Sequence, residues 1–277
     1  MLVAGVFPFL LGSAIAYHDT GSMDWFIFSC ALVGVLSVLG AVEAFNEYFD
    51  SRIGTDRVFS PDSSPPMPRS VFWVGLGCFA LALTIALYLS FHRTFGIMWF
   101  AVAGFIAAAF YVMPPIQWAY RGLGELCISL SYGPLMTLGG YYVQTARLDV
   151  RALPPSFVAC LLVFALVLAT EIPDYYQDWL VGKRNIVVRL GRKNAVLLYA
   201  GILWAFLAAV VIGGGPATGA LPRSSLVILA LVVPLWRSIR TAEKHYDFPS
   251  EFIGAIRGMV FVYVASLSIL SLSYLLE

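Results

Sequence analysis

Residues 25–50 read WFIFSCALVGVLSVLGAVEAFNEYFD, and the architecture follows from this stretch. Its first part, up to Val42, carries no charged residue and is close to the ~20 residues that a helix needs to cross a bilayer. Glu43, Asn46, Glu47 and Asp50 then follow without a spacer. The stretch therefore predicts a membrane-spanning helix that ends in a group of oxygen-bearing side chains.

Apolar stretches of similar length recur along the whole chain of 277 residues. The chain is 60% hydrophobic and 12% charged, whereas globular domains carry roughly 25% charged residues. Continuously apolar runs favour helices, because the strands of membrane barrels alternate polar and apolar residues. We therefore expect an all-α polytopic membrane protein, with residues 1–277 forming one integral-membrane domain. The nine expected spans are residues 2–17, 25–45, 71–91, 95–113, 126–144, 153–172, 195–213, 225–239 and 252–275.

The net charge and the cysteines exclude other classes of protein. A net charge of +1 gives no field that would attract nucleic acid. The four cysteines stand singly in apolar runs, as small buried hydrophobic residues do, which argues against a disulfide scaffold. The lipid bilayer is the partner that the composition indicates, and no obligate protein partner is inferred.

The distribution of charge predicts the topology. Twelve of the 17 lysines and arginines fall on the side that holds the N-terminus and the loops after the even-numbered spans. By the positive-inside rule this side is cytoplasmic and the C-terminus lies outside, and we expect a multi-pass protein of a prokaryotic cell membrane. Twelve of the 16 acidic residues lie on the same side, which indicates that the chemistry takes place there.

A second acidic helix end occurs four spans after the first. Residues 170–184 read TEIPDYYQDWLVGKR and place Glu171, Asp174 and Asp178 on one helical face. Glu43, Asn46 and Asp50 share a face in the same way. Because both segments leave even-numbered spans, we expect them to meet at one face of the membrane.

This combination of acids and bases predicts a metal–diphosphate site. Carboxylate and amide oxygens are the ligands that Mg²⁺ prefers, completed by phosphate oxygens. Converging carboxylates repel one another by about 4 kcal/mol per close pair at a protein surface, so they need a cation between them. Lys183, Arg184 and Arg121 would bind the remaining phosphate oxygens.

The motifs resemble those of the UbiA superfamily of intramembrane prenyltransferases. N-x-x-x-D-x-x-x-x-x-D, met at Asn46, Asp50 and Asp56, is similar to the first aspartate-rich motif of that family. D-x-x-x-D-x-x-x-x-K-R, met from Asp174 to Arg184, is similar to the second. Residues 111–125 and 131–144 resemble the menaquinone-pathway branch, the 1,4-dihydroxy-2-naphthoate prenyltransferases. The chain has Glu47 and Thr170 where the family often has Asp and Asn.

The resemblance implies a nine-helix bundle around a central cavity and a transferase reaction. A polyprenyl group would pass from its diphosphate to an aromatic acceptor of the quinone-precursor type, with Mg²⁺ assisting ionisation of the diphosphate. The implied catalytic and metal-binding residues are Asn46, Asp50, Asp56, Asp174 and Asp178. The allylic cation needs aromatic faces, each worth about 0.5–2 kcal/mol, and the candidates for the prenyl or aromatic subsite are Tyr48, Tyr111, Tyr141 and Tyr142.

Two other functions fit parts of the pattern. A UbiA-type terpene cyclase would use the same metal–diphosphate site. An ion-coupled transporter would also place acids within a membrane, but such sites lie near the midplane rather than at helix ends. Roles for Glu43, Glu125, Glu171 and Arg257 stay open at this level.

Overall fold

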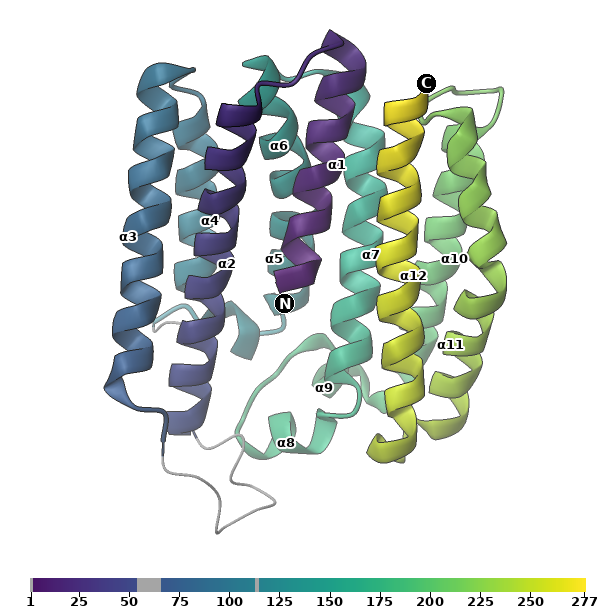
Figure 1. Ribbon diagram of the computed structural model, residues 1–277. Coiled ribbons are helices and arrows are strands. Elements are labelled where there is room, and N and C mark those ends of the chain that lie inside the picture. The colour runs from purple at the N-terminus through teal and green to yellow at the C-terminus, as the bar shows by residue number, and fades with distance from the viewer. Residues whose placement is uncertain (1, 54–65, 113–114) are drawn as a thin grey trace.

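The computed structural model describes residues 2–53, 66–112 and 115–277, and all regular structure in these residues is helical, as expected. Figure 1 shows long helices standing side by side in one bundle. They are α1 (Leu2–Thr20), α2 (Trp25–Ile53), α3 (Arg69–His92), α4 (Ile97–Val112), α5 (Gly124–Leu130), α6 (Met136–Thr145), α7 (Leu153–Glu171), α10 (Arg192–Gly214), α11 (Val232–His245) and α12 (Pro249–Leu276). Shorter elements are η2 (Trp118–Tyr120), the π-helical η3 (Ser131–Leu135), η4 (Val150–Ala152), α8 (Tyr175–Leu180), α9 (Ile186–Leu190) and η5 (Arg223–Leu231).

The helices have the dimensions of an integral membrane protein. Within the described residues, six helical segments are long and apolar enough to cross a bilayer, and Ile97–Tyr111 is a shorter apolar helix. The six are Trp25–Arg52, Arg69–His92, Val150–Glu171, Arg192–Gly214, Arg223–His245 and Pro249–Leu276. Each of the nine predicted ranges falls largely in helix, but nine transmembrane crossings are not confirmed by these dimensions.

The fifth predicted span is broken in its middle. Pro134 has no N–H to donate, and the chain makes the π-helical turn η3 there between α5 and α6. Beside it, Gly133 lies so close to α7 that a Cβ on it would come within 2.5 Å of the Cys160 Cα. The lack of a side chain at Gly133 thus lets the backbones of η3 and α7 pack in direct contact.

Small residues also bring α1 against α6. A Cβ on Gly12 would lie 1.9 Å from the Thr137 carbonyl oxygen, and one on Gly140 would lie 2.4 Å from the Phe9 carbonyl oxygen. Lipid is as apolar as the side chains, so helices in membranes associate through such close packing. The two glycines therefore fix α1 in the middle of the bundle.

Helix α7 is the centre of the packing. Two thirds (67%) of its most apolar window is buried inside the protein, against 11% for α3, which stands at the edge of the bundle in Figure 1. Fully buried Leu162 and Leu168 of α7 share a core with Leu203 of α10 and Leu267 of α12. The end of α7 that carries the second acidic motif is consequently held by packing on several sides.

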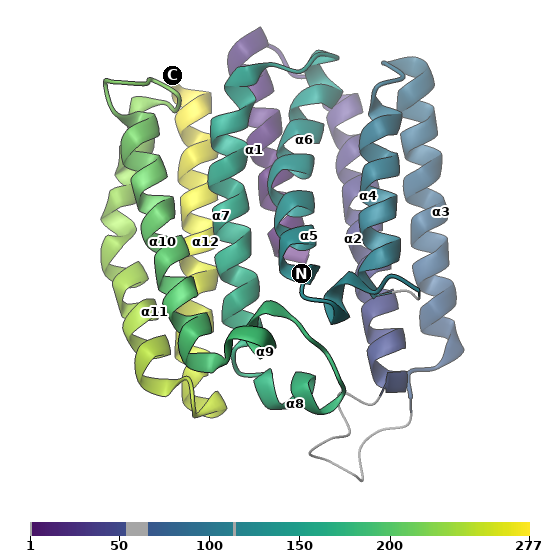
Figure 2. The ribbon, with the colours of Figure 1, turned by 180° about the vertical axis from the view of Figure 1, so that it is seen from behind.

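The chain places α8, α9 and the C-terminal end of α2 at one end of the bundle, here called the acidic end (Figures 1 and 2). Both views also place the C-terminus of the chain at the other end, here called the opposite end. The two acidic motifs therefore lie on the same side of the bundle, as their spacing in the sequence predicts.

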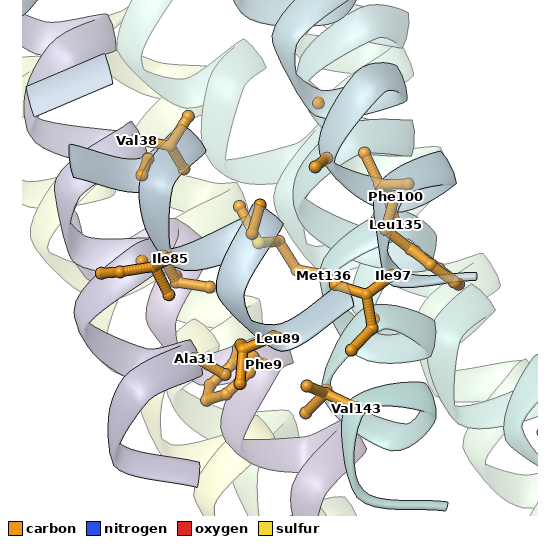
Figure 3. A pocket seen from close by; sticks show the side chains of 18 of the residues that line it. Phe9, Ala31, Val38, Ile85, Leu89, Ile97, Phe100, Leu135, Met136 and Val143 are labelled. Carbon is orange, nitrogen blue, oxygen red and sulfur yellow. The ribbon is translucent and has the colours of Figure 1, made fainter. Parts of the chain in front are cut away.

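Two adjoining cavities run through the half of the bundle that contains α2 and α4. The larger, about 180 Å³, lies among α1, α2, α3, α4 and α6, with Phe9, Ala31, Leu89 and Ile97 in its wall (Figure 3). The smaller, about 50 Å³, has Asn46, Tyr111 and Tyr132 in its wall. Both are bordered by Val38, Gly104, Leu135 and Met136. Together the two cavities extend along the bundle, and the smaller one reaches Asn46 of the first acidic motif.

Candidate active site

Tyr120 links the two acidic helix ends. Its hydroxyl donates to Asp50 Oδ1 at 3.1 Å, and its carbonyl oxygen accepts from the Arg184 N–H at 3.1 Å. The Lys183 ammonium lies 5.5 Å from the centre of the Tyr120 ring. The first motif, η2 and the chain after the second motif therefore form one contiguous group.

Both carboxylate oxygens of Asp178 are held by its own segment of chain. Oδ1 pairs with the Lys183 ammonium at 3.2 Å, and Oδ2 accepts from Asn185 Nδ2 at 2.7 Å. Asn185 in turn caps α9, because its Oδ1 accepts from the Val188 N–H at 2.8 Å. Asp178 is only 5% exposed and Asn185 only 2%. The position of this carboxylate is therefore fixed by a helix cap.

Burial and opposite charges set the ionisation of this group. Burial raises the pKa of Asp178, although Lys183 and Asn185 act against the shift. Burial alone would lower the pKa of Lys183, but the carboxylates of Asp50, Asp178 and Glu171 outweigh it and raise that pKa. Burial and the adjacent Asp50 also raise the pKa of Tyr120 well above its usual value. Lys183 is thus an ammonium and Tyr120 a hydrogen-bond donor at neutral pH.

Buried polar groups lie one layer deeper in the bundle. Asn46 Oδ1 is buried and has no hydrogen-bond donor among the described residues. The fully buried Glu125 accepts a hydrogen bond from the Ile186 N–H through Oε1, which ties α5 to the start of α9. Glu171 lies next to Glu125 at the end of α7. Deeper in the bundle than Asp50 and Asp178, the site therefore contains the amide oxygen of Asn46, which accepts no hydrogen bond from the described residues. It also contains the carboxyl groups of Glu125 and Glu171.

The other predicted metal ligands differ in placement. Asp174 immediately precedes α8 and is exposed at the acidic end, while Asp56 lies outside the described residues. In the part of the chain that the structure describes, no three acidic, histidine or cysteine side chains gather closely enough to hold a metal ion by themselves. The carboxylates are instead distributed over the ends of α2 and α7 and the start of α8.

The predicted phosphate-binding cations make different contacts at the acidic end. Lys183 contacts Asp178 directly, whereas Arg184 is exposed and the Arg121 guanidinium donates to the Pro115 carbonyl at 2.8 Å. Arg189 crosses between the two loops and donates to the carbonyl oxygens of Arg184 and Arg121, each at 2.7 Å. Arg189 thus joins the loop after α4 to the loop after α8.

The four predicted aromatic residues are separated by the fold. Tyr111 borders the smaller cavity together with Asn46. Tyr48 faces α3, with its ring against Phe72 and the Arg52 guanidinium 3.5 Å from its centre. Tyr142 borders the larger cavity and pairs with Thr94 Oγ1 at 3.3 Å. The Tyr141 hydroxyl donates to Asp19 Oδ2 at 2.8 Å, at the opposite end. The structure therefore brings Tyr111 alone of these four to the acidic motifs.

Two residues of the site were missed in the sequence, Tyr120 and Asn185. Asn185 carries a signal that could have found it, since an asparagine just before a short apolar run is typical of a helix N-cap. Tyr120 lies within residues 111–125, which resemble the menaquinone-pathway branch, but nothing in the sequence relates this tyrosine to an aspartate 70 residues earlier.

Comparison with known proteins gives a consistent result. The sequence model of the UbiA prenyltransferase family matches residues 5–254. A 1,4-dihydroxy-2-naphthoate octaprenyltransferase of Bacillus subtilis (strain 168) is 26% identical over 208 residues, which cover 72% of this chain and 66% of that protein. A 2-carboxy-1,4-naphthoquinone phytyltransferase of Synechocystis is 26% identical over 257 residues, covering 91% and 82%. This chain thus spans about two thirds of the length of the Bacillus relative.

Solved structures share the fold at low sequence identity. A UbiA homolog from Aeropyrum pernix K1 superposes with a TM-score of 0.70 at 15% identity, covering 100% of this chain and 98% of that one. A UbiA homolog from Archaeoglobus fulgidus, bound to DMAPP and Mg²⁺, gives a TM-score of 0.62 at 14% identity, covering 96% of each chain.

Proposed function

Because this chain belongs to the UbiA prenyltransferase family, we propose that it transfers a polyprenyl group from a prenyl diphosphate to an aromatic quinone precursor of the dihydroxynaphthoate type. The observation that carries the proposal is the meeting of two acidic helix ends around Tyr120 and Lys183. Relatives named for naphthoate and naphthoquinone substrates support the choice of acceptor.

The residues present fit Mg²⁺ bound together with a diphosphate. Mg²⁺ usually takes one or two carboxylates and completes its shell with water and substrate phosphates. Asp50, Asp178 and the orphaned oxygen of Asn46 offer such a sparse ligand set, to which Asp174 and Asp56 would add carboxylates. The bound metal would neutralise the diphosphate as a leaving group. Lys183 would bind a phosphate oxygen, with Arg121 and Arg184 at the rim.

The adjoining cavities fit the prenyl chain. Helix α2 faces them with Asn46, Val42, Val38, Gly34 and Ala31, one stripe of the helix. From Asn46 to Ala31 this stripe extends roughly 22 Å along the helix axis, at ~1.5 Å per residue. Burying each CH₂ of an isoprenoid there is worth about 0.8 kcal/mol. The donor would therefore lie with its diphosphate at the acidic end and its tail along α2.

Larger side chains at the positions of α2 that border the cavities should exclude the longer prenyl diphosphates. Val38→Phe, in the wall common to both cavities, is expected to lower kcat/KM for long prenyl diphosphates by roughly five- to 150-fold, since overpacking costs about 1–3 kcal/mol. Dimethylallyl diphosphate, which ends before this depth, should react normally. Ala31→Phe, at the far end, should affect the longest donors alone.

Val33→Phe is the matched control, because Val33 lies on the same helix but faces outward with 46% of its surface exposed. It should leave the preference for donor length unchanged. Equal losses for short and long donors in Val38→Phe would argue against a tail along α2.

The charge distribution supports an orientation for the reaction. Most lysines and arginines lie at the ends of the even-numbered predicted spans, so the acidic end would face the cytoplasm of a prokaryotic cell and the C-terminus the outside. Nine crossings give this arrangement. The three beyond the six segments above would be α1, α4, and the pair α5 and α6 taken together. The polar diphosphate of the donor would then lie at the cytoplasmic side of the membrane.

The direct test of the function is product analysis. Purified protein with Mg²⁺, a labelled polyprenyl diphosphate and dihydroxynaphthoate is expected to yield a prenylated acceptor, identified by mass spectrometry. Release of a cyclised hydrocarbon regardless of acceptor would instead identify a terpene cyclase. No consumption of any prenyl diphosphate by correctly folded protein would refute the proposal.

A further inference from the structure

The Lys183 ammonium lies among carboxylates at the acidic end, where a metal ion would also be attracted. It lies 3.2 Å from Asp178 Oδ1 and its side chain is 18% exposed. The carboxylates of Asp50 and Glu171 act on it as well. A divalent ion that approached Asp178 at the same oxygen would meet a positive charge at close range.

The two partners of Asp178 are attached to the chain in different ways. Asn185 is 2% exposed and fixed by its own bond to the α9 backbone, so its grip on Oδ2 cannot easily be released. Lys183 holds Oδ1 through a flexible four-carbon stem that can turn to another acceptor. One oxygen of Asp178 is therefore bound by a buried side chain fixed to α9, and the other by a charge on a flexible stem.

We propose that Lys183 is a tethered counter-ion, which holds Asp178 until a metal–diphosphate complex arrives and then turns to the diphosphate. This inference rests on the proposed function. The Lys183 ammonium leaves the carboxylate of Asp178 and pairs with a phosphate oxygen. Asn185 meanwhile keeps Asp178 in position to bind the metal. Binding of the metal alone is thereby disfavoured, so metal and diphosphate bind together.

The proposal is tested by metal binding without diphosphate. Mn²⁺ alone serves as the probe, and its binding to the full-length protein in nanodiscs is followed by loss of the free-ion electron paramagnetic resonance signal. Lys183→Met, which keeps the stem and removes the charge, is expected to bind Mn²⁺ at least about tenfold more tightly than the unmodified protein, because a close like charge is removed. Its prenyl transfer is expected to fall.

Two variants complete the design. Arg184→Met removes the neighbouring exposed charge and should leave Mn²⁺ affinity within about twofold, since exposed charges are screened. Lys183→Arg keeps the charge and should keep the weak binding, which separates charge from any loss of folding in Lys183→Met. Unchanged or weaker Mn²⁺ binding in a folded Lys183→Met, while the unmodified protein still transfers the prenyl group, would overturn the counter-ion role alone. Loss of metal-dependent transfer in every protein, the unmodified one included, would instead overturn the proposed function.

Discussion

Asp50→Asn is expected to reduce prenyl transfer at least about a hundredfold, the loss typical when a preorganised electrostatic group is removed from an active site. Asp50 stands where the two helix ends meet, bonded to the Tyr120 hydroxyl at 3.1 Å. An asparagine keeps an oxygen that can accept this hydrogen bond and removes the charge. The loss should therefore appear in consumption of prenyl diphosphate, measured in membranes at saturating donor, with little change in the amount of folded protein.

The same helix offers the control. Asp24 precedes α2 at the opposite end, where its Oδ1 accepts from the N–H groups of Phe26 and Ile27. Asparagine caps helices as well as aspartate does, so Asp24→Asn makes the same chemical change away from the site. It should leave the turnover unchanged. If Asp50→Asn and Asp24→Asn both turned over at nearly the normal rate, the mechanism based on two converging acidic helix ends would be wrong.

Chelation is expected to abolish product formation almost completely. A metal supplies several kcal/mol of charge stabilisation to a departing diphosphate, and Lys183, Arg121 and Arg184 cannot replace a divalent ion between carboxylates. Adding EDTA to the purified protein should therefore stop the appearance of prenylated acceptor, and excess Mg²⁺ should restore it. The measurement is the initial rate of product formation by mass spectrometry.

Reversibility separates chemistry from folding in this experiment. Full recovery with Mg²⁺ indicates that the helix bundle survives chelation, as expected for a fold whose core is built on α7, α10 and α12 rather than on a metal. Ca²⁺ is larger and accepts more ligands, so it should restore the rate poorly. If EDTA left the rate unchanged, the reaction would not require a metal ion. Lys183 would then be the principal positive charge at the leaving group.

The helices and the convergence of the acidic motifs could be predicted because both depend on local patterns. An apolar run of membrane length forces a helix, since no other open structure satisfies its backbone in lipid. The parity of the spans then sends Asp50 and Asp178 to one end of the bundle, where Tyr120 and Lys183 join them.

Of the four aromatic candidates, Tyr111 and Tyr142 border the two cavities, whereas Tyr48 and Tyr141 contact other parts of the bundle. Tyr48 lies two residues from Asp50 but on the other side of α2, against Phe72. Tyr141 is adjacent in sequence to Tyr142, yet its hydroxyl bonds to Asp19 and not to the cavity that Tyr142 borders. Which face of a helix meets a cavity is set by the neighbouring helices, and the sequence of one helix does not contain them.

By itself, the sequence determined that this protein is a helical membrane bundle with oxygen ligands and cations at one end, because length, apolarity and helical spacing are properties of short segments. The tertiary structure alone decided which groups act on each other. The bridge from Tyr120 to Asp50 and the contact of Glu125 with α9 join segments whose meeting depends on how the helices pack. That packing is fixed by close approaches such as Gly133 against Cys160, which only the folded chain brings about.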